Sequence, residues 1–140
     1  MRWMRLVRVA AVLVALVGCG NSSSKGSTPA TTTKRPSTAA KLQILQPSPN
    51  QVTGTSVTVQ VNLIGATIVP ATNVGTPKNG NEGHIHLSVD GKIVQMAYQS
   101  TYQLTGLTPG QHNLSAEFVA TDHLPFANRV VAAVLFTVQG

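Results

Sequence analysis

The sequence GHIHLSVDG, residues 83–91, alternates polar and apolar side chains and ends in an Asp-Gly turn signal. This period of two predicts a β-strand that enters a tight turn. The apolar residues are expected to face a core, whereas His84, His86 and Ser88 share the opposite face. Two imidazoles about 7 Å apart along one strand suit half of a metal site, and they suit equally a pair of polar surface residues.

Six further runs with strand character surround this stretch. The cleanest is residues 56–64 (SVTVQVNLI), in which valine and leucine alternate with polar residues. The others are residues 42–45, 92–98, 101–104, 111–120 and 130–138, separated by turn and loop sequences rich in Gly, Pro and Asn. About seven short strands in about 100 residues, with turn signals at this spacing, predict an all-β fold: a Greek-key sandwich of the immunoglobulin or fibronectin type.

Two loops and one turn between these runs have features of their own. Residues 65–82 form a long connection, which is expected to be functional or mobile, with Ile68-Val69 as a short strand or a plug inside it. Residues 121–128 (TDHLPFAN) are expected to be the loop before the last strand. Tyr102 lies shortly before the turn GLTPG, residues 106–110, and resembles the corner tyrosine of such sandwiches, the alternative being simple packing on the sandwich edge.

The charge distribution argues against nucleic acid as a partner. The chain has 140 residues and a formal net charge of +6, but most of its cations precede residue 42. From there on, three cations (Lys78, Lys92 and Arg129) stand against four carboxylates, so this part carries a net charge of −1. A near-neutral domain without a basic surface does not track phosphates.

The N-terminus is typical of a bacterial secretion signal. Residues 1–8 are cationic, and residues 9–17 (VAAVLVALV) are apolar but too short to cross a bilayer. The run ends in Leu16-Val17-Gly18-Cys19, which resembles the lipobox of bacterial lipoproteins. That resemblance implies a signal peptide over residues 1–18, fatty acylation of Cys19 and an extracytoplasmic protein anchored in the membrane or cell envelope. The alternatives are an ordinary cleaved signal or an N-terminal membrane anchor.

The segment after the cysteine predicts a flexible tether. Cys19 is the chain's single cysteine, so the chain cannot form an internal disulfide. Residues 20–41 are rich in Ser, Thr, Gly, Pro and Ala and lack apolar periodicity, which favours disorder with a reach on the order of 25 Å. The expected organisation is therefore residues 1–18 as signal, 19–41 as lipidated cysteine plus tether, and 42–140 as the sandwich.

The predicted topology brings three of the four histidines together. In a sandwich of this type, the strand of His84 and His86 shares a sheet with the last two strands, so its start lies beside the loop that carries Asp122 and His123. We therefore expect a metal site at His84, His86 and His123, with Asp122 as a ligand or as an orienting group. Imidazole and carboxylate suit Cu(II), Zn or Ni, and copper is the preferred candidate.

Two other residues carry side chains that can bind a metal. Met96 is a soft donor that suits Cu(I), but its spacing does not place it at the histidines. His112 is expected at the opposite end, as a core or corner histidine with the inward parity of Leu114.

Three segments that contain the histidines carry a further resemblance. The patterns Gly83-His84-Ile85-His86-Leu87 and Leu107-Thr108-Pro109-Gly110-Gln111-His112, followed by Asp122-His123, resemble small secreted bacterial domains of unknown function. The resemblance covers about the last 60 residues and implies no activity.

Catalytic patterns are not found in the sequence. Ser88 is not held in a nucleophile elbow, and the four carboxylates lack the spacing of a hydrolase pair. We therefore expect a binding protein rather than an enzyme, with the membrane as one partner through the lipid anchor. One hypothesis is a metal-binding module. The other is an immunoglobulin-like interaction module that binds an envelope protein or a glycan through the loops at residues 65–82 and 121–128.

Overall fold

The computed structural model describes residues 34–70, 75, 77 and 79–140. The predicted signal peptide, Cys19 and most of the predicted tether lie outside these residues. The described part contains nine strands: β1 (Lys41–Gln46), β2 (Val52–Thr53), β3 (Val57–Ile64), β4 (Thr67–Ile68), β5 (Glu82–Val89), β6 (Lys92–Ala97), β7 (Thr101–Leu104), β8 (Gly110–Ala120) and β9 (Pro125–Val138). Within the described residues there is no helix long and apolar enough to span a membrane.

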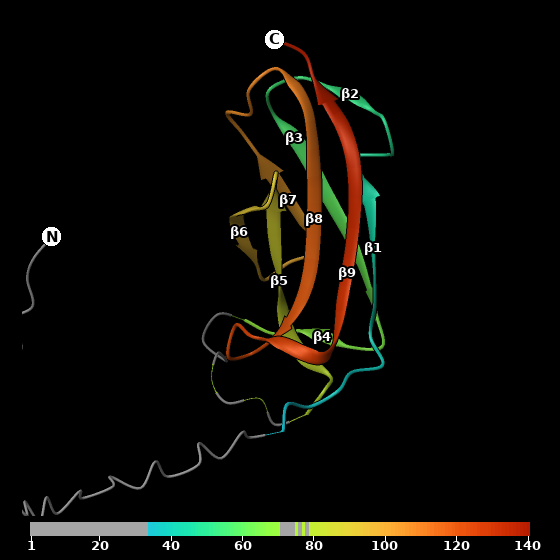
Figure 1. The fold of residues 1–140 in the computed structure, drawn as a ribbon, viewed down its shortest axis with the longest axis vertical. Helices are drawn as coiled ribbons and strands as arrows, with labels where there is room; N and C mark the ends of the chain where they lie inside the picture. Colours follow the sequence, from blue (N-terminus) through green and yellow to red (C-terminus); the bar gives the residue numbers. More distant parts are fainter. Residues whose placement is uncertain (1–33, 71–74, 76, 78) are drawn as a thin grey trace, which may run out of the picture. The chain divides into compact units, whose positions relative to one another are not determined.

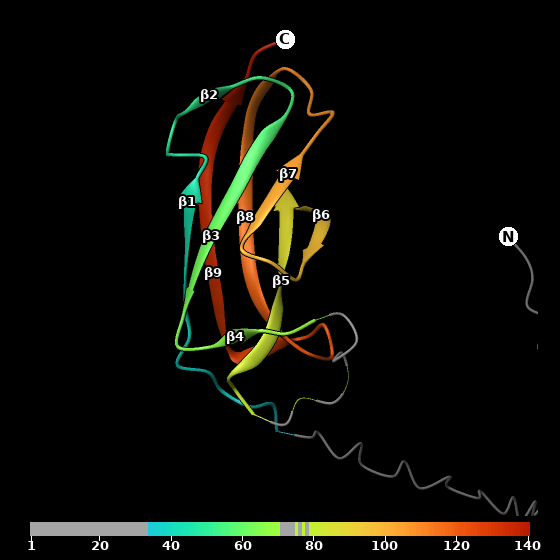
Figure 2. The same cartoon turned by 180° about the vertical axis from the view of Figure 1, so that it is seen from behind.

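The strands form two sheets that pack face to face (Figure 1, Figure 2). One sheet has the order β1-β3-β7, and the other has the order β2-β9-β8-β5-β4 with β6 also paired to β5. The all-β sandwich predicted from the alternating runs is thus confirmed. The strand of His84 shares its sheet with β8 and β9, as the expected topology required.

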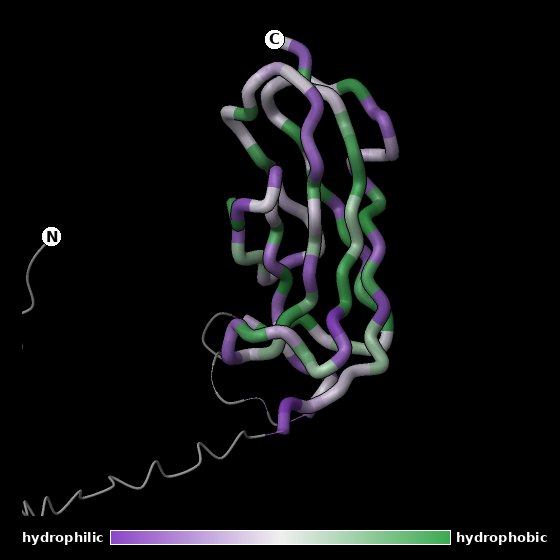
Figure 3. Tube along the Cα trace, in the orientation of Figure 1, coloured by the Kyte–Doolittle hydropathy of each residue, from purple (hydrophilic) through white to green (hydrophobic). Residues whose placement is uncertain are grey.

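The core lies between the two sheets and is built from the alternating apolar residues. Val57, Val59 and Val61 of β3 are buried, and they face the sheet in which Phe118 and Phe136 are completely buried. The alternation along these strands is visible in the hydropathy colouring of Figure 3. Each fully buried valine or phenylalanine side chain stabilises the fold by about 1.5–3 kcal/mol relative to an exposed one.

The polar face of β5 differs from the expectation of a surface. His84 has no exposed area and His86 is 9% exposed, so both faces of the strand are buried at this end. The alternative that His84 and His86 are a pair of polar surface residues is therefore wrong. The reason lies in segments distant in sequence, since Tyr98 and the β8–β9 loop cover the two imidazoles.

The sandwich also takes up the end of the segment expected to be a tether. Thr38 is buried; its backbone nitrogen donates to Asn128 Oδ1 at 2.9 Å, and its carbonyl accepts from Asn128 Nδ2 at 2.7 Å. The backbone nitrogen of Ala127 donates to the carbonyl of Pro36 at 3.0 Å. Ordered structure thus begins before residue 42, because one asparagine side chain satisfies the backbone of a segment without apolar periodicity.

The last strand begins earlier than expected, at Pro125, so the loop expected over residues 121–128 is shorter. The pairing of β8 with β9 shifts between Phe118, which pairs with Val130, and Val119, which pairs with Pro125. The shift bulges the residues between them out of register, and Phe126 is buried there against Phe118 with ring centroids 5.1 Å apart.

Candidate metal centre

Three histidines from two separate segments converge at one end of the sandwich. His84 Nε2 lies 3.2 Å from His86 Nε2 and 2.9 Å from His123 Nδ1. One ligand nitrogen from each ring lies within 4.8 Å of the others. The rings of His86 and His123 are the most widely separated pair, with centroids 5.8 Å apart. The three residues expected from the sequence are therefore brought together by the fold.

The local backbone explains this convergence. His84 and His86 stand two residues apart on β5, so their side chains leave the same face of the sheet. Gly83 pairs with Ala120 at the end of β8, which places the following turn directly beside His84. That turn is closed by hydrogen bonds from His123 N to the carbonyl of Ala120 and from Ala120 N to the carbonyl of Leu124, both 3.0 Å.

Gly83 and His123 each have a backbone feature that the site requires. A Cβ added at Gly83 would lie 2.0 Å from the carbonyl oxygen of Val119, so only glycine permits this close approach of β5 to β8. His123 has a φ of 64°, in the left-handed region. This conformation turns the chain back over β5 and directs the imidazole to His84.

The nitrogen separations suit a transition-metal ion. Two imidazole nitrogens bound to one ion at about 2.0 Å lie about 2.8 Å apart at a right angle and about 3.3 Å apart at the tetrahedral angle. The observed 2.9 and 3.2 Å fall in this range. The side chains therefore already stand close to the positions that direct ligation requires.

Burial keeps the imidazoles neutral. Desolvation lowers the pKa of His84 from 6.5 to about 4, with further lowering by the neighbouring His123 and His86. Desolvation, followed by the influence of His123, also lowers the pKa of His86. Near pH 7 both rings therefore offer lone pairs, because no proton has to be displaced before an ion binds.

The contacts of His84 Nε2 with His86 Nε2 and His123 Nδ1 also lie at hydrogen-bond distance, and which nitrogen donates depends on the tautomer of each ring. A cation at this point would instead accept one lone pair from each of the three rings. In addition, His84 Nδ1 is buried and has no hydrogen-bond partner among the residues that the structure describes. A buried nitrogen without a partner is costly, and a metal ion bound at Nε2 would leave this cost in place because Nδ1 is on the other side of the ring.

Two carboxylates on the strand and turn beside the cluster, Asp122 and Glu117, are each bound by an arginine. Asp122 does not join the three histidines; its carboxylate binds Arg35, with Nη1 to Oδ2 at 2.7 Å and Nη2 to Oδ1 at 2.9 Å. Hydrogen bonding to Arg35 lowers the pKa of Asp122. The expected direct ligation by Asp122 is therefore not supported. Glu117, opposite His86 on β8, is bound in the same way by Arg129.

Met96 is the residue that sequence reasoning did not place. The register of β5 with β6 sets Met96 directly across from His86, so the two side chains leave the same face of the sheet. The Asp-Gly turn predicts this hairpin, but an irregularity between Leu87 and Ser88 shifts the pairing of the two strands by one residue. A regular hairpin counted from the turn would therefore not place Met96 opposite His86.

The fourth histidine lies at the opposite end of the sheet, as expected. His112 Nδ1 is 2.7 Å from Asp90 Oδ2, and its Nε2 is 2.7 Å from the carbonyl oxygen of Thr108. These two partners raise the pKa of His112, with the carbonyl of Thr108 contributing most. Both ring nitrogens are satisfied, which is the arrangement of a structural histidine. The Tyr102 hydroxyl accepts from the backbone nitrogen of Tyr98 at 3.0 Å, as a corner tyrosine would.

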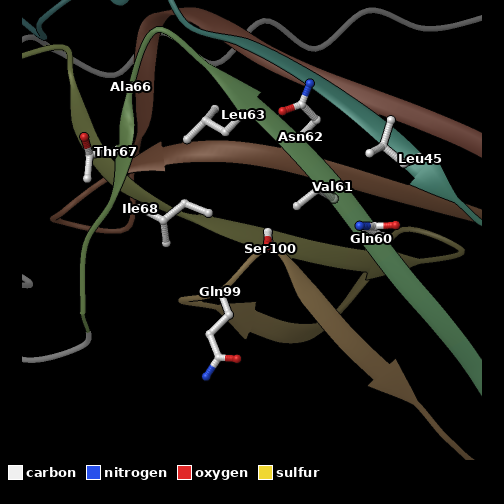
Figure 4. Close-up of a pocket in the computed structure, with 10 residues that line it drawn as sticks. All are labelled: Leu45, Gln60, Val61, Asn62, Leu63, Ala66, Thr67, Ile68, Gln99 and Ser100. Atoms are coloured by element: carbon white, nitrogen blue, oxygen red, sulfur yellow. The ribbon is translucent and has the colours of Figure 1, made fainter.

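A second concave site opens between β3, β4 and the β6–β7 turn (Figure 4). It is a cleft of about 540 Å³. Its lining combines apolar side chains with three amides and two hydroxyls: Leu45, Gln60, Val61, Asn62, Leu63, Ala66, Thr67, Ile68, Gln99 and Ser100. None of these lining residues is charged or carries an imidazole, so the cleft offers a ligand amides, hydroxyls and apolar side chains.

Some solved structures are similar to the chain at low sequence identity. The chain is similar to the fibronectin(III)-like modules of Clostridium thermocellum CbhA, with 16% identity over 69% of this chain and 93% of that chain and a TM-score of 0.49. It is also similar to the CARDB domain of PF1109 from Pyrococcus furiosus, with 14% identity over 74% of this chain and 96% of that chain and a TM-score of 0.44. No protein-family model and no curated protein matches the chain.

Proposed function

We propose that this protein is a lipid-anchored, extracytoplasmic binding module that holds a transition-metal ion, copper, through His84, His86 and His123. The observation that carries the proposal is the convergence of one nitrogen from each ring, with contacts of 3.2 and 2.9 Å to His84 Nε2. Imidazole is the commonest metal ligand in proteins, and it binds as the neutral ring.

The donor set supports copper in particular. Imidazole suits Cu, Zn and Ni, and Cu(II) favours tetragonal geometry, in which some ligands stand at right angles and others opposite one another. The two short nitrogen separations are compatible with this geometry and with a tetrahedral one, so the choice of copper rests on the donor types. Met96, across from His86, would offer a thioether to Cu(I), the reduced form of the same metal.

The metal proposal is tested by titrating Cu(II) into the full chain purified in detergent. We expect one ion per chain, held with high affinity, and loss of that binding in the His84→Ala/His86→Ala variant. His112→Ala is the matched control, because it removes the one histidine whose ring nitrogens are already satisfied, at the other end of the sheet. Binding that is not saturable, or that is lost equally in the control while the control remains folded, would exclude the site.

The anchoring proposal rests on the sequence LVGC, residues 16–19, after a short apolar run. Acylation of Cys19 with two or three chains would hold the protein stably, whereas a single chain holds only marginally. We expect cells fed labelled fatty acid to label the wild-type chain and not Cys19→Ser. The variant should then fail to remain with the membrane after washing at high salt. Equal membrane retention of an unlabelled variant would contradict the proposal.

A second candidate function is an interaction module for a neutral, hydroxylated ligand such as a glycan. The specific observation is the cleft of Figure 4, to which the long connection contributes Ala66, Thr67 and Ile68. Its amides can donate to and accept from hydroxyl groups. Addition of cell-envelope oligosaccharides should shift the amide NMR signals of Gln60 and Gln99, and unchanged signals would remove this candidate.

A further inference from the structure

One arginine makes four hydrogen bonds to the turn that carries His123. Arg35 Nη1 and Nη2 donate to the two carboxylate oxygens of Asp122 at 2.7 and 2.9 Å. Arg35 Nε donates to the carbonyl of Pro125 at 2.6 Å, and Nη2 also donates to the carbonyl of Leu124 at 2.9 Å. The guanidinium thus binds the residue before His123 and the two residues after it.

The turn needs such a contact more than the other ligand-bearing segment does. His84 and His86 stand on β5, which is paired on both sides by β6 and β8. His123 stands alone on a turn with a φ of 64°, which costs backbone free energy unless its surroundings hold it. The position of the third imidazole therefore depends on what fixes this turn.

Arg35 is itself fixed by the segment that carries it. Pro36 accepts a hydrogen bond from Ala127, and Thr38 exchanges two with Asn128. We call the four hydrogen bonds of Arg35 the clamp. The clamp joins the segment before β1 to the β8–β9 turn, which is nearly 90 residues away in sequence. Its guanidinium is partly covered, with 29% of the side chain exposed against 24% for Asp122, so it is less screened than a fully exposed pair.

We propose that Arg35 is a positioning residue that holds His123 against His84 and thereby preorganises the metal site. The inference rests on the proposed function, since it assigns a role in the same centre. Arg35 makes no contact with the metal. It acts through the turn, because four donors in a rigid fork fix Asp122, Leu124 and Pro125 at once, and a lysine with its single ammonium cannot reproduce that geometry.

The expected effect follows from the loss of one ligand. Without the clamp, the turn samples other conformations, and a bound ion keeps His84 and His86 but not His123. Partners that orient metal ligands typically change metal affinity by about 10- to 100-fold when they are removed. We expect a loss of this size in Arg35→Gln and also in Arg35→Lys, although the latter keeps the charge.

The test measures Cu(II) affinity and the number of coordinated imidazoles, the latter by pulsed electron paramagnetic resonance. Asp90→Asn is the matched control, because it removes a carboxylate from a different ion pair, which joins the turn after β5 to His112 at the opposite end of the sheet from His123. Wild type and Asp90→Asn should show three imidazoles, and Arg35→Gln should show two with weaker binding. In a His123→Ala background, Arg35→Gln should cause no further loss.

Two results would overturn the role of Arg35: equal affinity and three imidazoles in Arg35→Gln, or a loss that persists in the His123→Ala background. Failure of the proposed function looks different, because the wild-type chain then takes up no copper. In that case imidazole nitrogen NMR of the metal-free protein tests, without any copper, whether Arg35 holds His123 against His84. Loss of the contact between His84 and His123 in Arg35→Gln supports the clamp, and an unchanged contact refutes it.

Discussion

The buried imidazole at the centre of the cluster should make the metal-free domain sensitive to mild acid. In the folded protein, desolvation lowers the pKa of His84 from 6.5 to about 4. Between these two values, the unfolded chain takes up a proton that the folded chain refuses. Stability is therefore unaffected above about pH 6.5, falls as the pH drops, and levels off below about pH 4.

The magnitude follows from the two pKa values. For one group, the linkage relation gives a loss of about 2 kcal/mol in the free energy of unfolding at pH 5, and about 3 kcal/mol once the pH is below 4. A domain of this size is stable by roughly 5–15 kcal/mol, so the loss is a large fraction of the total. His86 adds to the effect in the same direction, because burial also lowers its pKa.

The perturbation that isolates His84 is His84→Leu, which keeps a similar volume without a titratable ring. Urea unfolding of the chelator-treated protein is compared at pH 7.5 and pH 5. At pH 7.5 the substitution removes both a buried nitrogen without a partner among the described residues and the contacts of His84 Nε2 with His86 and His123, so stability at this pH serves as the reference for each protein. At pH 5 the stability of the variant relative to that of the wild type should be about 2 kcal/mol higher than at pH 7.5.

Other titrating groups do not account for this difference, because they are present in both proteins. His86, which acts in the same direction as His84, therefore contributes to the pH dependence of both. The raised pKa of His112 has the opposite sign, since its contribution is fully present below pH 6.5 and is lost as the pH rises through the folded value. The lowered pKa of Asp122 acts only below about pH 4, where the unfolded carboxyl begins to protonate. Equal changes in wild type and His84→Leu between pH 7.5 and pH 5 would refute the assignment of a desolvated imidazole.

Two further predictions concern the strand that carries the site. Gly83→Ala places a methyl group 2.0 Å from the Val119 carbonyl oxygen, so we expect urea unfolding to show a free energy of unfolding lower by about 3 kcal/mol. Gly54→Ala is the control: a Cβ there has nothing within 4 Å, so the free energy of unfolding should change by less than about 0.5 kcal/mol. A loss of similar size in both variants would contradict the close approach. Met96→Leu preserves volume opposite His86 but removes the thioether, so Cu(I) affinity in competition titrations should fall by about tenfold, or about 1.4 kcal/mol, with Cu(II) affinity unchanged. An unchanged Cu(I) affinity would exclude Met96 as a donor.

Features set by local alternation could be predicted from the sequence. The strands around Val59, Ile85 and Phe118 follow from a period of two, because each places one apolar face against the core. The meeting of His84 with His123 also followed, because placing their strands in one sheet brings the strand start and the loop to the same end. Sheet topology is a coarse property, and it was sufficient for this apposition.

Features set by distant side chains could not be predicted. Asp122 is expected from the sequence as a ligand or as an orienting group, but the partner of its carboxylate, Arg35, is 87 residues away in a segment without periodicity and could not be foreseen. The burial of His84 depends on Tyr98 and on the turn of His123, so the alternation of its own strand carries no signal for it. Pairing between distant polar groups leaves no pattern in one sequence.

The contrast between histidines within this one chain separates a structural role from a ligand role. His112 is buried and each ring nitrogen has a partner, a carboxylate on one side and a carbonyl on the other. His84 is buried more deeply, yet one nitrogen has no partner among the described residues and the other faces two imidazoles. If the cluster served packing alone, apolar side chains of the same volume would fill the space without the cost of desolvating three polar rings. In the proposed function a cation accepts one lone pair from each ring, so the support for a metal is the convergence of three buried or half-buried imidazoles at one point.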